Sequence, residues 1–162
     1  MAVDIFKLDN QHLLLSSAQA LGAASYATLL DKHPSVKIID PKKWLFIVSA
    51  ASIFMISHEI ENKNIPETEK KDVIDSIKSL ALKLDADYVR ACKDCESFID
   101  RTIIGLAKVE QYQQEPQYLF SDCLGGWICW NLFGRSPSGE EELKLVRVLG
   151  SMVVFEIMRS LN

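Results

Sequence analysis

Apolar residues recur every three or four positions along most of the chain, and almost no segment alternates between apolar and polar residues over the length of a strand. That spacing is typical of helices with one buried face. The pattern therefore predicts an all-α protein. We expect a single helical domain over residues 1–162, folded as a bundle of five to seven helices.

The most apolar stretch is WLFIVSAASIFMIS, which covers residues 44–57 and contains fourteen residues without a charge. A helix that is apolar on all sides is either buried in a protein core or lies in a membrane. Fourteen residues fall short of the roughly twenty that a bilayer span needs. Asp40 can cap the helix and Pro41 suits its first position. We therefore expect a central core helix over about 41–61, with the other helices around it.

The other helical segments are separated by prolines, a glycine and acidic residues, and they run over about 4–31 or 9–31, 66–84, 88–109, 117–133 and 138–161. If the first of these helices begins near residue 9 rather than residue 4, Asp9 can cap it. Asp85-Ala86-Asp87 interrupts the pattern, so residues 67–110 form either one bent helix or two helices. We favour a break, because a soluble helix of about forty residues is rare. The polar segment 111–117, QYQQEPQ, is expected to be a loop.

Local signals also mark the ends of the last two segments. Gly134 is a natural C-terminal cap for the helix over 117–133. Ser138 and Glu141 have the S-x-x-E spacing of a capping box, which would open the final helix. Its expected buried stripe consists of Leu143, Val146, Leu149, Val153, Ile157 and Leu161.

Charge argues against a nucleic-acid partner. The formal net charge is −4, and the basic residues are spread along the chain close to acidic ones. Nucleic-acid binding usually requires a basic patch. The first ten residues, MAVDIFKLDN, lack the basic region and long apolar run of a signal peptide, so the cytoplasm is the expected compartment.

A second uncharged stretch runs from Leu13 to Leu30, over eighteen residues. It contains serine, glutamine, tyrosine and threonine together with many alanines. That composition suits a packed helix with small contact residues better than a helix that faces lipid. Membrane insertion is therefore not expected.

Cys92 and Cys95 form a C-x-x-C sequence, the spacing found in redox-active dithiols. Those motifs depend on a helix N-terminus that lowers the pKa of the first thiol. Here both cysteines lie inside an expected helix and on its apolar stripe, so we interpret them as core residues. A thiol redox role for the pair is kept as a third hypothesis.

No metal site or cofactor is expected. Cys123 and Cys129 are separated by five residues, which does not match the spacing of zinc ligands. The three histidines include no H-E-x-x-H and no E-x-x-H spacing. Nucleotide-binding loops and the nucleophile elbow of hydrolases are also absent from the sequence, so an enzyme is not favoured.

His58 ends the central apolar stretch and is followed by Glu59 and Glu61. One interpretation is a titrating group at the mouth of a pocket, with one of these glutamates as its partner. The other is that histidine only suits the negative end of a helix. His58 is the best single candidate for a functional ionisable group, because it adjoins the most buried element.

Aromatic residues crowd the segment 117–133, where Trp127 and Trp130 share one helical face close to Gly125 and Gly126. Glycine in a helix interior costs roughly 1 kcal/mol relative to alanine, so its presence needs a reason. One reason is a pocket or groove that a ligand or partner approaches. The other is close packing of a neighbouring helix.

Three functions remain as hypotheses, and the leading one is a non-enzymatic protein that acts by binding another protein, as a regulator, adaptor or inhibitor. The second is a small-molecule binder or sensor with an apolar pocket between the helices at 41–61 and 117–133. Its expected contacts are Phe54, Trp127 and Trp130, with His58 or Tyr88 as the polar contact. The third is the thiol redox protein that uses Cys92 and Cys95. Homodimerisation is compatible with each of them.

Overall fold

The computed structural model describes residues 3–162, and this part of the chain contains seven α-helices, two short 3-10 helices and no strand. The prediction of an all-α bundle of five to seven helices is therefore confirmed. In chain order the elements are α1 (Leu8–Leu30), η1 (Pro34–Ile38), α2 (Pro41–Glu61), α3 (Glu67–Leu84), α4 (Asp87–Leu106), α5 (Glu110–Gln114), η2 (Pro116–Tyr118), α6 (Leu119–Phe133) and α7 (Gly139–Leu161).

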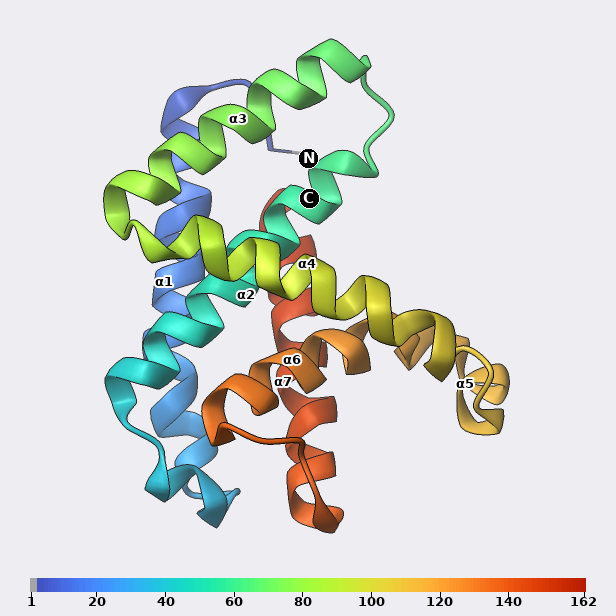
Figure 1. Cartoon of the computed structure of the whole chain (residues 1–162). Helices are drawn as coiled ribbons and strands as arrows, with labels where there is room; N and C mark the ends of the chain where they lie inside the picture. Colours follow the sequence, from blue (N-terminus) through green and yellow to red (C-terminus); the bar gives the residue numbers. More distant parts are fainter. Residues whose placement is uncertain (1–2) are drawn as a thin grey trace.

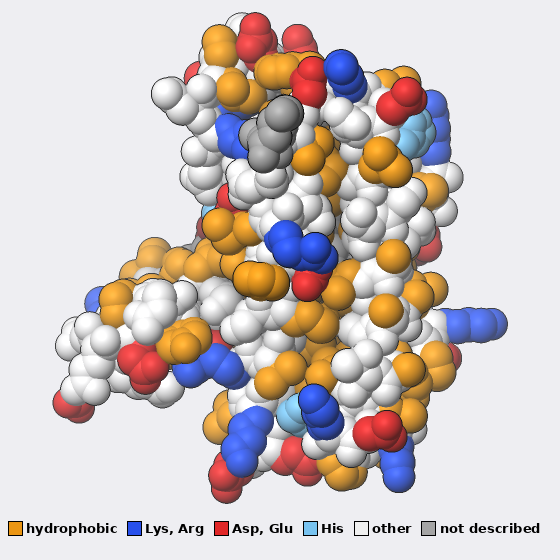
Figure 2. All heavy atoms as spheres, turned by 180° about the vertical axis from the view of Figure 1, so that it is seen from behind, with side chains coloured by type: hydrophobic (Ala, Val, Ile, Leu, Met, Phe, Trp, Pro, Cys, Tyr) orange, Lys and Arg blue, Asp and Glu red, His pale blue; other side chains and the backbone are white. Residues whose placement is uncertain are grey.

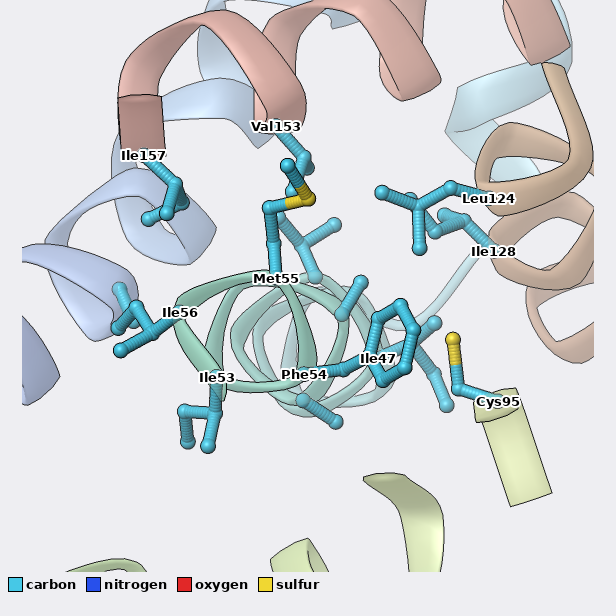
Figure 3. Close-up of a cluster of buried hydrophobic side chains, with 14 of the residues drawn as sticks. Ile47, Ile53, Phe54, Met55, Ile56, Cys95, Leu124, Ile128, Val153 and Ile157 are labelled. Carbon is cyan, nitrogen blue, oxygen red and sulfur yellow. The ribbon is translucent and has the colours of Figure 1, made fainter. Parts of the chain in front are cut away.

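Helix α2 has the predicted bounds and passes through the middle of the bundle (Figure 1). It begins as expected, because the Asp40 side chain accepts a hydrogen bond from the backbone N–H of Lys42 at 2.9 Å and Pro41 occupies the first helical position. Side chains leave α2 on every side in Figure 3, where Met55 points toward α7 and Phe54 lies near Cys95 of α4. Helix α2 is apolar on all sides, and other helices cover it on all sides.

Helices α1 and α7 lie side by side in opposite directions. The backbone N–H of Val3 donates to the carbonyl of Leu161 at 3.2 Å, and the N–H of Ser35 donates to Glu141 at 3.2 Å, so opposite ends of the two helices meet. The two ends of the chain consequently lie close together (Figure 1). Helix α1 begins at Leu8, between the two predicted starts, and Lys7 rather than Asp9 precedes its first residue.

From Leu13 to Leu30, the outer face of α1 is uncharged and exposed. Its small and apolar exposed side chains belong to Leu13, Ser16, Ser17, Ala20, Ala23, Ala24 and Ala27. Figure 2 shows hydrophobic side chains gathered along α1 and the neighbouring α7 on this side of the molecule. Helices α1 and α2 are both long and apolar enough to span a membrane by length and composition, but 67% of the α2 window is buried in the bundle, against 33% for α1.

The break between α3 and α4 is confirmed. Asp85 has an extended backbone, and its side chain accepts a hydrogen bond from the N–H of Asp87 at 2.8 Å, where α4 begins. The prediction for residues 111–117 is wrong, because α5 and η2 occupy most of this segment. A tertiary contact explains the difference: the hydroxyl of Tyr112 in α5 donates to Asp122 of α6 at 2.8 Å.

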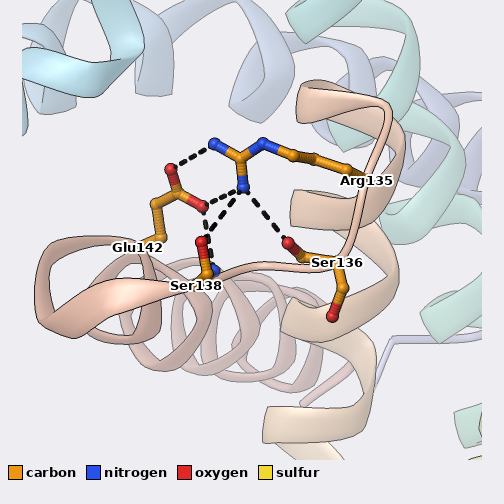
Figure 4. A network of polar contacts seen from close by, with 4 residues as sticks. All are labelled: Arg135, Ser136, Ser138 and Glu142. Carbon is orange, nitrogen blue, oxygen red and sulfur yellow. Dashed lines mark hydrogen bonds and ion pairs between the residues drawn. The ribbon is translucent and has the colours of Figure 1, made fainter.

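Gly134 ends α6 with a positive φ of 72°, as predicted for a C-terminal cap. The capping box predicted for the start of α7 does not form, because the Ser138 side chain makes no capping hydrogen bond and Glu142 rather than Glu141 accepts from the N–H of Ser138, at 3.0 Å. Arg135 decides this by donating two hydrogen bonds of 2.7 Å to Glu142 (Figure 4). These bonds, from Arg135 first and then from Ser138, lower the pKa of Glu142 to about 2.

The buried stripe of α7 also differs in its first turn. Leu143 is 57% exposed, whereas Leu145 is fully buried. From Leu145 the buried residues follow at intervals of four along one ridge of the helix: Leu149, Val153, Ile157 and Leu161. This ridge faces the core around α2, and Val146 lies beside it against α6.

Glycines bring α6 and α7 into backbone contact. A Cβ atom at Gly125 would lie 2.0 Å from the carbonyl oxygen of Val146, and one at Gly150 would lie 1.9 Å from the carbonyl oxygen of Ser121. Only residues without a side chain fit such a crossing. Of the two explanations for the glycines of α6, close helix packing therefore applies to Gly125.

Candidate functional site

A cavity of about 260 Å³ lies between α2, α3 and α4. Its apolar wall comes from all three helices and consists of Ile53, Ile74, Ala81, Val89 and Ile99. The amphipathic stripes of α3 and α4 supply most of that wall. Helix α6 contributes a single residue, Phe120.

Three rings form one side of the cavity. His58 stacks on Phe120 with ring centroids 4.4 Å apart and an angle of 18° between the ring planes. Phe54 lies 5.8 Å from His58 at 30° and 6.5 Å from Phe120 at 21°. The three ring planes lie within 30° of one another, so the rings form a nearly parallel stack.

His58 belongs to the last turns of α2, where the helix leaves the core. The side-chain nitrogen of Asn62 lies 3.2 Å from Nε2 of His58 and donates a hydrogen bond to the carbonyl oxygen of His58 at 3.0 Å. Burial of the ring lowers the pKa of His58, while the negative charges of Glu59, Glu61 and Glu96 act in the opposite direction. Because burial is the larger effect, the pKa of His58 lies below its ordinary value, which favours the neutral ring.

Exposed charges of both signs surround the cavity. Lys78 and Lys93 carry positive charge, and Glu61, Glu96 and Asp100 carry negative charge. No ion pair joins any two of these five side chains within residues 3–162. The edge of the cavity therefore has nearly balanced charge and groups free to face solvent.

The cysteines of the C-x-x-C sequence are in surroundings that stabilise the thiol form. Cys92 lines the cavity and donates a weak hydrogen bond to the carbonyl oxygen of Ala50 at 3.4 Å. Burial raises the pKa of Cys92 to about 12 and raises that of Cys95 as well. A redox dithiol needs the opposite shift, which argues against the redox hypothesis.

Of the residues proposed from sequence, Phe54, His58 and Cys92 line the cavity together. Tyr88 and Cys95 lie elsewhere in the core, and Tyr88 is stacked on Phe46 with ring centroids 5.2 Å apart. The remaining two are Trp127 and Trp130 of α6, which contact the side of α4 that faces away from the cavity.

Neither tryptophan takes part in the cavity. Trp127 is buried and its indole N–H donates to Asp94 at 2.9 Å, whereas Trp130 is exposed and packs edge-on against Phe98 at 6.0 Å. The space expected between α2 and α6 is filled by side chains such as Leu124 and Ile128 (Figure 3). The cavity thus opens on the α3 and α4 side of α2.

Phe120 comes from the aromatic segment 117–133 that the sequence singled out, whereas the residues of α3 and α4 in the cavity wall were missed. Their signal was present as amphipathic spacing, but such a stripe does not say which partner helix covers it. No protein-family model, no curated protein and no solved structure matches the chain.

Proposed function

We propose that this protein binds a small apolar molecule in the cavity between α2, α3 and α4, as a sensor or carrier. The observation that carries the proposal is a cavity of about 260 Å³ between three helices, with an apolar and aromatic lining. Ligand sites are typically apolar with a few polar groups, and this volume lies just below their usual range of roughly 300–1,000 Å³.

A substitution that fills the cavity tests the proposal. Naphthalene, an uncharged apolar probe, should raise the melting temperature of the wild-type protein by about 4 °C at roughly tenfold excess over its Kd. Val89 is half-buried and lines the cavity, so Val89→Trp should abolish this shift by occupying the space. Differential scanning calorimetry with and without naphthalene measures both results.

Val148→Trp is the matched control, because Val148 is a half-buried valine on α7 that does not line the cavity. This variant should keep the naphthalene-induced shift. Absence of a shift in the wild-type protein, or an equal shift in Val89→Trp, would contradict ligand binding in this cavity.

A second function, binding of another protein, is supported by the outer face of α1. This face has no charge from residue 13 to residue 30, and most of it is exposed. Solvent faces of helices usually carry charged residues, as α3 does with Lys71, Asp72 and Asp75. Small side chains on α1 also allow a partner helix to approach closely, and we propose a second copy of this chain as that partner.

Charge placed on this face should prevent self-association. Ala20 is exposed at the middle of the uncharged face, so Ala20→Arg should weaken dimerisation by tenfold or more, because the arginine would be buried without a partner. Ser79→Arg, on the exposed side of α3, should leave it unchanged. Sedimentation equilibrium measures the association constant. A weak dimer would be detectable at about 100 μM. If the wild-type protein stays monomeric at that concentration, the dimer is refuted and the cavity proposal is unaffected.

A further inference from the structure

The hydrogen bonds around His58 determine which ring nitrogen carries the proton. The terminal group of Asn62 that lies 3.0 Å from the His58 carbonyl oxygen must be the NH₂ group, since two acceptors would repel. The same NH₂ group lies 3.2 Å from Nε2 of His58. It can only donate there, so Nε2 is the acceptor and the proton of the neutral ring is on Nδ1.

This leaves an N–H donor at the cavity without a partner in the protein. Among residues 3–162, no hydrogen-bond acceptor pairs with Nδ1 of His58, although the ring is half-buried. Nδ1 is not one of the buried unpaired atoms of residues 3–162, so water can accept its hydrogen bond in the free protein. An acceptor on a molecule bound in the cavity that His58 lines would take the place of that water. Phe120 and Phe54, which flank the histidine ring, offer no such acceptor themselves.

The shape and the charge of the site restrict the molecule further. The nearly parallel rings of Phe54, His58 and Phe120 favour a planar aromatic molecule, which can align with them and place its own edge against the edge of the His58 ring. Two positive and three negative side chains at the edge give no strong preference for either sign. The volume of about 260 Å³ accommodates a molecule with one or two fused rings.

We propose that the cavity takes an uncharged, planar aromatic molecule of one or two rings, whose edge bears a carbonyl oxygen or ring nitrogen that accepts a hydrogen bond from Nδ1–H of His58. This inference rests on the proposed ligand-binding function and specifies its ligand. His58 is then the residue that selects for the acceptor, and Asn62 is the positioning residue that holds the required tautomer.

A pair of matched probes tests the hydrogen bond. 2-Acetylnaphthalene and 2-ethylnaphthalene have nearly the same size and shape, but only the ketone has an acceptor. Their dissociation constants are measured by equilibrium dialysis on the wild-type protein and on His58→Phe, which keeps an aromatic ring and removes the donor. The ratio of the ketone Kd to the ethyl Kd should rise about tenfold in His58→Phe.

A second measurement does not depend on the folding of a variant. Nitrogen-15 NMR of the wild-type imidazoles should find His58 protonated at Nδ1, and the ketone should shift that N–H resonance while 2-ethylnaphthalene leaves it nearly in place. Asn62→Ala removes the donor to Nε2 and should allow the other tautomer to appear.

The possible outcomes separate the two proposals. If both probes bind but their Kd ratio is the same in the wild-type protein and His58→Phe, the hydrogen bond from His58 to the ligand is refuted, while ligand binding in the cavity stands. If His58 is protonated at Nε2 in the free protein, the tautomer argument is refuted. If neither probe binds the wild-type protein, ligand binding in this cavity fails together with this inference.

Discussion

Gly125→Ala should destabilise the protein by about 3 kcal/mol or more, the largest effect that we expect from the removal or addition of a single methyl group. The added Cβ would lie 2.0 Å from the carbonyl oxygen of Val146 and 3.1 Å from the backbone nitrogen of Gly150. Because both atoms are backbone atoms, no side-chain rotation relieves the clash, and α6 must move away from α7. Urea unfolding followed by circular dichroism measures the loss.

The neighbouring glycine is the control for this substitution. A Cβ at Gly126 would meet only the ring of Phe98, at 3.7 Å, which is an ordinary contact. Gly126→Ala should therefore stabilise α6 by up to about 1 kcal/mol through helix propensity. Gly150→Ala should resemble Gly125→Ala, since its Cβ would lie 1.9 Å from the carbonyl oxygen of Ser121. Similar effects at Gly125 and Gly126 would refute the proposed backbone crossing.

Arg147→Leu should cost about 2–3 kcal/mol of stability, because it leaves Asp122 charged and buried without its partner. Asp122 is 7% exposed, and Arg147 donates to its two carboxylate oxygens at 2.8 and 3.0 Å. The guanidinium group also lies 3.9 Å above the ring of Tyr118. Breaking a fully buried pair typically costs about 3–5 kcal/mol, and we expect less because the Arg147 side chain is 33% exposed.

Two further variants identify the cause of that loss. Lys144→Leu removes a fully solvated ion pair with Glu140 on the same helix, so it should change stability by less than about 0.5 kcal/mol. The double variant Asp122→Leu/Arg147→Leu should recover most of the loss, since no buried charge then remains unpaired. Thermal unfolding of the four proteins gives the comparison. A double variant less stable than Arg147→Leu would refute the explanation by an unpaired charge.

Local sequence signals predicted the elements well where the chain decides its own conformation. The bounds of α2, the Asp40 cap, the break at Asp85 and the left-handed Gly134 were all predicted, because each depends on residues close together in the sequence. The errors arose where a distant group intervenes. Arg135 draws Glu142 instead of Glu141 into the cap of α7, and Asp122 holds Tyr112 and thereby α5 in place.

The candidate site was predicted only on the side that α2 supplies. Phe54 and His58 follow from their positions on the most apolar helix, and both line the cavity. Trp127 was expected beside them, but its indole N–H turns toward Asp94 of α4. Which aromatic residue faces a cavity and which one fills the core depends on the rotation of each helix relative to its neighbours, and periodicity does not specify that rotation.

By itself, the sequence determined the helical class, the approximate bounds of the longer helices, and the central place of α2, because apolar spacing and end signals are local properties of the chain. The tertiary structure decided the rest. It brought Gly125 against Gly150, paired Asp122 with Arg147, and left space beside His58 where α3 and α4 diverge from α2. Packing of side chains from separate helices sets those distances, and only the assembled bundle contains that information.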